Sequence, residues 1–211
     1  MKAIIVANGT LSRDMAIQSL LADADLVIAA DGGAVHLQRL GVSPDIIIGD
    51  LDSISDDALA SFKSEQIPMA AHPARKDQTD TELCIDYALA QGCREILFLG
   101  VTGNRLDHTL ANIFLLRRLA DQGITARITD AHNDIYLVLS DLVLKGVPGD
   151  LLSVIPVSDR VTGLTLTGLE YPLTDKTLHM GTALGVSNCF TGHEATVHID
   201  SGAVIVTKSR D

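Results

Sequence analysis

The spacing of apolar and polar residues changes once along this 211-residue chain. In the first part, short uninterrupted apolar runs alternate with segments whose apolar residues recur every three to four positions. Uninterrupted runs are typical of strands buried on both faces, and the longer period is typical of helices that cover them. Strands that alternate with helices predict a parallel sheet with helices on both of its faces.

The expected strands of this sheet are residues 2–7, 26–30, 45–49, 67–71, 95–99 and 124–129. The expected helices are one capped by Ser12, one over 34–40, one from Ser55 to about Ser64, one that Asp77 or Thr79 opens and that ends at Ala90, and one over 106–121. The apolar stripe of the last helix is predicted to consist of Leu110, Ile113, Phe114, Leu116 and Leu119.

From about Asn133 the segments become short, are separated by Gly, Pro, Asp or Ser, and several alternate between apolar and polar residues. Such alternation is typical of antiparallel strands with one buried face. The expected strands are 135–139, 142–145, 151–157, 160–167, 176–179, 182–187, 194–199 and 203–207. We therefore expect a domain boundary near residue 140, with an α/β domain over 1–140 and a small β-sandwich or barrel over 141–211.

Composition narrows the possible partners. The formal charge of −11 argues against a nucleic-acid surface, which requires clustered Lys and Arg. No apolar run is long enough to span a membrane, and the N-terminal residues are those of a first strand. The three cysteines are an odd number without metal-ligand spacing, so we expect reduced thiols in a cytoplasmic protein.

The residues that follow the apolar runs carry the candidate chemistry. Asp50 and Asp52 come directly after the expected strand 45–49, and acidic residues at such a position are explained by a bound cation. Mg²⁺ is the usual cation where phosphates are handled. The alternative is a strand end that runs into a helix, with Asp52 or Ser53 as the helix cap.

Three further motifs are expected at the same carboxyl edge of the sheet, where open parallel sheets bind their ligands. They are Asp31-Gly32-Gly33, Arg75-Lys76-Asp77-Gln78-Thr79-Asp80, and Gly100-Val101-Thr102-Gly103-Asn104-Arg105-Leu106-Asp107-His108. Glycines allow backbone amides to approach phosphate, and Arg or Lys can offset its charge. Each motif alone is better explained by a turn, a helix cap or a surface ion pair. All of the motifs together at one edge of the sheet favour a single site with metal and phosphate partners.

The ordered set of motifs, together with Gly185-Val186-Ser187-Asn188, resembles the signature of the thiamine pyrophosphokinase family over residues 1–209. The resemblance implies Mg²⁺-dependent transfer of the pyrophosphoryl group of ATP, as co-substrate, to the hydroxyl of thiamine, which gives thiamine diphosphate and AMP. It also implies a Rossmann-like ATP-binding catalytic domain (1–140) followed by a thiamine-binding β-sandwich domain (141–211). It further implies a homodimer whose active sites lie between subunits.

The resemblance assigns roles by position. Magnesium ligands would be Asp50, Asp52 and Asp80, and the wider catalytic set would be Asp31, Asp50, Asp52, Asp77 and Asp80. The nucleotide would be bound by Gly32, Gly33, Arg75, Lys76, Thr79, Thr102, Gly103, Asn104, Arg105, Asp107 and His108. Thiamine would be bound near Ser187 and Asn188, and because the chain has no Trp, Phe190 or Tyr171 would stack on it.

Two points stay open on the sequence. Metal-bound carboxylates are poor bases, so the proton acceptor is whichever of Asp31, Asp77 or Asp80 does not bind metal. A metal-dependent phosphohydrolase and a nucleotide-binding regulatory module would use the same residues. A dinucleotide oxidoreductase is disfavoured because no Gly-x-Gly-x-x-Gly follows the first strand.

Overall fold

The computed structural model describes residues 1–12, 15–73 and 77–210. The chain forms two compact units, Met1–Ala131 (unit 1) and His132–Asp211 (unit 2). The expected boundary near residue 140 would leave β7 (Asn133–Val138) in the first domain. In the structure, β7 pairs along its whole length with β14 (Val204–Ser209), and the units divide between Ala131 and His132, so β7 belongs to unit 2.

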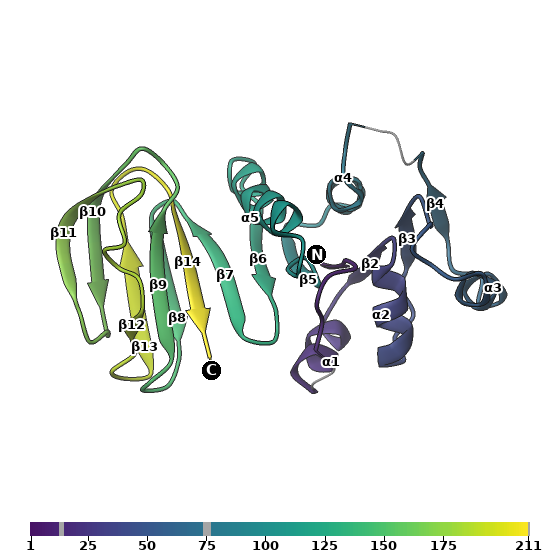
Figure 1. The fold of residues 1–211 in the computed structure, drawn as a ribbon, viewed down its shortest axis with the longest axis horizontal. Coiled ribbons are helices and arrows are strands. Elements are labelled where there is room, and N and C mark those ends of the chain that lie inside the picture. The colour runs from purple at the N-terminus through teal and green to yellow at the C-terminus, as the bar shows by residue number, and fades with distance from the viewer. Residues whose placement is uncertain (13–14, 74–76, 211) are drawn as a thin grey trace. The chain divides into compact units, whose positions relative to one another are not determined.

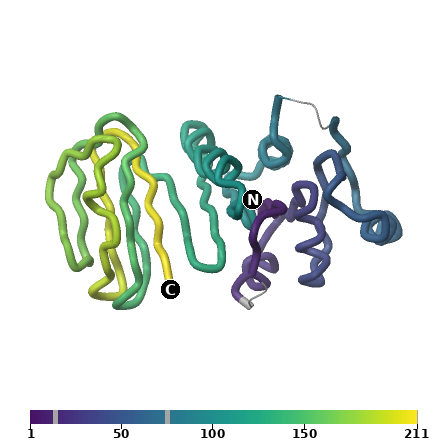
Figure 2. The backbone as a smooth tube through the Cα atoms, in the orientation of Figure 1, coloured from purple at the N-terminus to yellow at the C-terminus, as the bar shows by residue number. Residues whose placement is uncertain are grey.

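Unit 1 contains the predicted parallel sheet. Its strands are β1 (Lys2–Val6), β2 (Leu26–Ala30), β3 (Ile46–Gly49), β4 (Met69–Ala71), β5 (Glu95–Leu99) and β6 (Thr125–Thr129). Their order is β6-β5-β1-β2-β3-β4, and each neighbouring pair is parallel. The chain runs outward from β1 to β4 and then returns to β5 on the other side of β1 (Figure 2). The strand order therefore reverses between β1 and β5.

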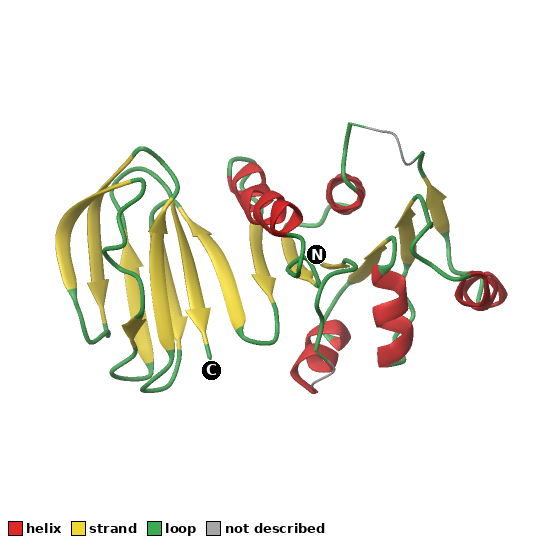
Figure 3. Ribbon diagram, viewed as in Figure 1, coloured by secondary structure: helices red, strands yellow, loops and turns green. Residues whose placement is uncertain are grey.

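Helices cover both faces of this sheet (Figure 1, Figure 3). The helices are α1 (Met15–Ala22), α2 (Gly33–Leu40), α3 (Asp56–Ser64), α4 (Asp80–Ala90) and α5 (Leu106–Ala120). Apolar residues of α1, α2 and α3 share one core with alternate residues of the central strands, while α4 and α5 lie over the opposite face. Among the described residues, no helix is long and apolar enough to cross a membrane.

Local sequence explains where the helices begin. The hydroxyl of Ser55 accepts a hydrogen bond from the amide of Ala58 and caps α3. At α4, the Thr79 hydroxyl accepts from the Glu82 amide while the Glu82 carboxylate accepts from the Thr79 amide, a capping box. The expected caps at Ser55 and Thr79 are thus confirmed, and Thr79 rather than Asp77 opens α4.

Unit 2 is a sandwich of two antiparallel sheets, as predicted. Strands β12 (Asn188–Cys189), β9 (Leu151–Pro156), β14 and β7 are hydrogen-bonded in this order. The second sheet has the order β11 (Leu173–His179), β10 (Arg160–Thr167), β13 (Glu194–His198) and β8 (Asp141–Lys145). Inward-facing side chains of both sheets, such as Val154, Val206, Leu164 and Val197, form one core.

One predicted strand of unit 2 is wrong. Residues 182–187, expected as a strand, form turns, and a short strand follows at Asn188–Cys189. The backbone explains this difference, because Gly185 has a φ of 99° and Ser187 a φ of 57°. Left-handed conformations at two nearby residues are incompatible with an extended strand.

Candidate active site

The carboxyl ends of the parallel strands bring the predicted motifs to one edge of unit 1. Residues Ala30 of β2 and Ile48 of β3 are partners in the sheet, and Val6 of β1 is the partner of both Ala29 and Leu99. The segments that leave these strands therefore start side by side. They contain Asp31-Gly32-Gly33 after β2, Asp50-Leu51-Asp52 after β3, and the loop from Gly100 to Arg105 after β5.

Three carboxylates converge at this edge. One oxygen each of Asp31, Asp50 and Asp52 lies within 4.8 Å of the others, a spacing that suits a shared cation. Asp31 is only 8% exposed, and its Oδ1 atom is buried without a hydrogen-bond partner among the described residues. A buried carboxylate oxygen without a partner is costly. Its position beside two further carboxylates is an arrangement that could hold a metal ion.

The backbone is bent to form the cluster. Asp31 and Leu51 have left-handed conformations, with φ of 45° and 66°, and the Asp31 amide donates to the carbonyl of Ile48 at 2.9 Å. Left-handed non-glycine residues are uncommon and occur where the surrounding structure requires them.

Gly33 begins α2 so close to β1 that a Cβ would overlap the carbonyl oxygen of Val6. Gly32 is the residue before α2 and Gly33 is its first residue, so both lie at a helix N-terminus, where backbone amides can bind anions.

The start of α4 supplies the next set of predicted residues. Thr79 is the cap, Asp80 is the first helical residue, and Asp77 is exposed just before them. Asp80 is not a member of the three-carboxylate cluster, in which Asp31 occupies the third place instead. The predicted phosphate ligands Arg75 and Lys76 lie outside the described residues.

The loop after β5 is held in place by side chains around it. The Thr102 hydroxyl donates to Asp130 at 3.0 Å, and the Gly103 amide donates to the Thr109 hydroxyl at 3.2 Å. The side-chain amide of Asn112, which is buried in α5, donates to the carbonyl of Val101 at 2.9 Å. Asn104 is exposed in this loop. The loop thus has a defined shape at the edge of the sheet.

Arg105 and Asp107 form a bidentate ion pair at the start of α5. The Nε and Nη2 atoms of Arg105 donate to the two carboxylate oxygens of Asp107 at 3.0 and 2.6 Å. The guanidinium holds the pKa of Asp107 well below its usual range, and Asp107 raises the pKa of Arg105. His108 lies 3.9 Å from Asp107. All three side chains are exposed, so the pair fixes the direction of Arg105 and leaves it accessible to an anion.

Sequence reasoning missed the loop after β1. Residues Asn8-Gly9-Thr10 lie against the β5 loop, where the Gly9 amide donates to the carbonyl of Gly100 at 2.6 Å and the Thr10 amide to that of Thr102 at 2.7 Å. The Nε2 atom of His36 is hydrogen-bonded to the Gly9 carbonyl at 2.8 Å. The strand order reverses between β1 and β5, and open α/β sheets bind ligands at such a point. The strand order is the signal that identifies this loop.

In unit 2, Ser187 and Asn188 differ in their environment. Ser187 is exposed, while Asn188 is buried and its amide bonds the backbone: Oδ1 accepts from the amides of Tyr171 and Cys189, and Nδ2 donates to the Tyr171 carbonyl. Asn188 therefore fixes the segment that carries Tyr171, a residue that is 63% exposed. Phe190 is 2% exposed in the core, so the expectation that it stacks on a ligand is wrong.

Comparison with known proteins places this site in a family. Residues 17–128 match the family model of the thiamin pyrophosphokinase catalytic domain, and residues 142–204 match that of the thiamin pyrophosphokinase vitamin B1 binding domain. A thiamine pyrophosphokinase from Bacillus subtilis (strain 168) is 32% identical to this chain, and the alignment covers 100% of both.

Solved structures agree with the sequence comparisons. The crystal structure of thiamine pyrophosphokinase from Bacillus subtilis superposes with a TM-score of 0.91 at 30% identity, covering 100% of both chains. That of thiamin pyrophosphokinase from Geobacillus thermodenitrificans has a TM-score of 0.85 at 29% identity, covering 100% of this chain and 98% of the other. With two family models matched in order and a relative aligned end to end, this chain belongs to the thiamine pyrophosphokinase family.

Proposed function

We propose that this protein transfers the pyrophosphoryl group of ATP to the hydroxyl of thiamine and releases thiamine diphosphate and AMP. The observation that carries this proposal is the convergence of Asp31, Asp50 and Asp52 at the edge of the parallel sheet, where one buried oxygen of Asp31 has no hydrogen-bond partner among the described residues. The membership of the family supplies the substrates, ATP and thiamine. In the same proposal, unit 1 binds ATP and carries the catalytic residues, and unit 2 binds thiamine.

The metal of the reaction is proposed to be Mg²⁺. Carboxylate oxygens are the ligands it prefers, and it commonly completes its shell with water and substrate phosphates. Asp50 and Asp52 would hold it together with Asp31, and Asp80 at the start of α4 would be a further carboxylate of the site. When bound, Mg²⁺ supplies charge neutralisation for the phosphate oxygens during transfer.

The remaining groups of the site would bind and orient the nucleotide. The amides at the start of α2, beside Gly32 and Gly33, suit an anionic phosphate. Arg105, held in one direction by Asp107, would offset negative charge on the phosphates, with Thr102, Gly103, Asn104 and His108 around it. Arg75, Lys76 and Thr79 complete the proposed nucleotide-binding set.

The proton of the thiamine hydroxyl needs an acceptor that is not bound to metal. Because Asp31 belongs to the carboxylate cluster, Asp77 and Asp80 are the proposed candidates. The variants Asp77→Asn and Asp80→Asn distinguish these two candidate proton acceptors. The variant that lacks the base is expected to lose the acidic limb of the pH–rate profile, whereas loss of a metal ligand raises the Mg²⁺ concentration that is needed.

One assay tests the proposed function. The protein is incubated with ATP and Mg²⁺, with and without thiamine, and AMP and inorganic phosphate are measured. AMP that forms only with thiamine supports the pyrophosphokinase. Phosphate release without thiamine would indicate a phosphohydrolase instead, and nucleotide binding without turnover would indicate a regulatory module.

We further propose that the protein is a homodimer in which unit 1 of one subunit faces unit 2 of the partner across each active site. Thiamine would then contact Ser187, Tyr171 and the segment that Asn188 fixes. Light scattering is expected to give twice the 22.4 kDa of one chain, and a monomer would contradict the shared site. A cytoplasmic location belongs to the same proposal, based on three cysteines interpreted as reduced thiols.

A further inference from the structure

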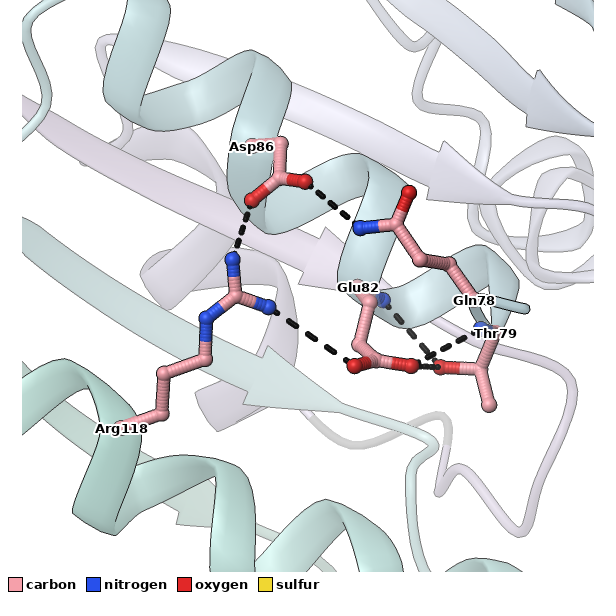
Figure 4. A network of polar contacts seen from close by, with 5 residues as sticks. All are labelled: Gln78, Thr79, Glu82, Asp86 and Arg118. Carbon is pink, nitrogen blue, oxygen red and sulfur yellow. Dashed lines mark hydrogen bonds and ion pairs between the residues drawn. The ribbon is translucent and has the colours of Figure 1, made fainter.

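Arg118 of α5 connects two carboxylates of α4. Its Nη2 atom donates to Oδ1 of Asp86, and its Nη1 atom lies 3.7 Å from Oε1 of Glu82 (Figure 4). Glu82 and Asp86 are four residues apart, so both point to the same side of α4. Two like charges at this spacing repel, and the guanidinium between them offsets the repulsion.

The other oxygen of each carboxylate holds the segment before α4. Oδ2 of Asp86 accepts a hydrogen bond from Nε2 of Gln78 at 2.8 Å. Oε2 of Glu82 accepts from the amide and the hydroxyl of Thr79 at 2.9 and 3.0 Å. Gln78 and Thr79 are the middle residues of the motif Asp77-Gln78-Thr79-Asp80, so both of its central side chains are linked to Arg118 through one carboxylate each (Figure 4).

We propose that Arg118 is a positioning residue for the transfer reaction, which acts through Glu82 and Asp86 to fix the segment from Asp77 to Asp80. This inference rests on the proposed function, which places Asp77 and Asp80 in the active site. All three charged side chains are partly exposed, at 35%, 27% and 43% for Arg118, Glu82 and Asp86. The ion pairs therefore contribute little to overall stability, and their effect is geometric. A small displacement of catalytic groups is enough to slow a reaction strongly.

The adjacent residue provides a matched control. Arg117 also lies on α5, but its Nε atom donates to Asp121 one turn further along the same helix, at 2.8 Å. Arg117→Gln and Arg118→Gln remove the same charge from the same helix. Only the second removes a contact with α4.

The first test is steady-state kinetics of thiamine-dependent AMP formation. Arg118→Gln is expected to lower kcat by about tenfold or more, because the affected segment carries the proposed catalytic carboxylates. KM for ATP is expected to rise by a smaller factor, because the same segment carries Thr79 of the proposed nucleotide-binding set. Arg118→Lys is expected to have an intermediate kcat, since an ammonium lacks the planar fork that reaches two carboxylates. Arg117→Gln is expected to match the wild type. Equal kinetics for the two glutamine variants would overturn the proposal.

The second test is amide hydrogen exchange, which does not depend on activity. In Arg118→Gln, exchange in residues 77–83 is expected to be at least about tenfold faster than in Arg117→Gln, with equal exchange in β1, β2 and β5. Unchanged exchange in 77–83 overturns the proposal even if Arg118→Gln has a lower kcat. A wild-type protein that makes no AMP with thiamine refutes the proposed function instead, whatever the exchange result.

If Arg118→Gln does not fold, Glu82→Gln continues the test. Glutamine keeps the capping box with Thr79 and loses the charge that attracts Arg118. A lower kcat in Glu82→Gln, with a smaller change in KM for ATP, supports the proposal. A wild-type kcat in this variant would overturn it.

Discussion

Gly49 and Asp31 approach so closely that a Cβ at position 49 would lie 2.8 Å from the Cβ of Asp31. We expect Gly49→Ala to displace the Asp31 carboxylate from the cluster with Asp50 and Asp52. Overpacking of this kind costs about 1–3 kcal/mol, so the free energy of unfolding in urea should fall by that amount. Thiamine-dependent AMP formation should fall by at least about tenfold, because the carboxylate no longer meets its neighbours.

Gly192→Ala is the control for this change. No atom of the described residues lies within 4 Å of a Cβ at position 192. Its free energy of unfolding is expected to stay within about 0.5 kcal/mol of the wild type, with unchanged AMP formation. A Gly49→Ala protein as active as Gly192→Ala would contradict the assigned role of Asp31.

Asp31→Asn tests whether the three carboxylates bind a metal ion or are only a cluster of like charges. Asparagine tolerates the left-handed conformation of residue 31, and a neutral amide removes repulsion among the three carboxylates. In EDTA, we expect the Tm of Asp31→Asn to exceed that of the wild type. Mg²⁺ should raise the Tm of the wild type, since about 2.7 kcal/mol of stabilisation accompanies a ligand at 100 times its Kd, and should raise that of the variant much less.

The exposed Asp159 supplies the matched substitution for this experiment. Asp159→Asn removes one negative charge in unit 2 and leaves the three carboxylates of the cluster in unit 1 unchanged. Its Tm is expected to respond to Mg²⁺ as the wild type does. An Asp31→Asn protein with a full response to Mg²⁺ would show that the cluster does not bind the ion.

The alternation of strands and helices in unit 1 could be predicted because each apolar run is bounded by residues that break it. The edge at which the motifs meet followed from the same alternation, since parallel strands share one carboxyl edge. Strand order could not be predicted in this way. It places β2 beside β3, which adds Asp31 to Asp50 and Asp52, and β1 beside β5, which adds the loop of Gly9.

The spacing of apolar residues also did not predict which residues of a helix are buried. Leu110 and Phe114 were predicted in the buried stripe of α5, yet they are 45% and 53% exposed, whereas Leu116 and Leu119 are buried. A period of three to four residues gives a wide apolar face. It does not say which part of that face the sheet covers, and the sequence therefore left this part of α5 undetermined.

Asn112 is expected to support the nucleotide-binding loop. Its amide donates to the carbonyl of Val101, and both groups lie between α5 and the β5 loop. In Asn112→Ala this carbonyl loses its donor, at a cost of about 1–3 kcal/mol in the free energy of unfolding. We expect KM for ATP to rise more than kcat falls, because the loop is proposed to bind the nucleotide. Gln38→Ala, which removes an exposed amide from α2, should change neither. An unchanged KM for ATP in Asn112→Ala would argue against nucleotide binding at this loop.

His198 is expected to make the stability of unit 2 depend on pH. Its Nδ1 atom lies 2.7 Å from Asp141 and its Nε2 atom 3.2 Å from Asp200, and these carboxylates raise the pKa of the imidazole above its usual 6.5. A raised folded-state pKa means that the stabilisation is complete below the unfolded pKa and is lost as pH rises through the folded pKa. Between about pH 6 and about pH 9, the Tm of the wild type should therefore fall more than that of His198→Gln.

His193→Gln, at an exposed histidine of the same unit, should behave as the wild type. Parallel Tm curves for the wild type and His198→Gln would show that the imidazole bonds these carboxylates equally well without its charge.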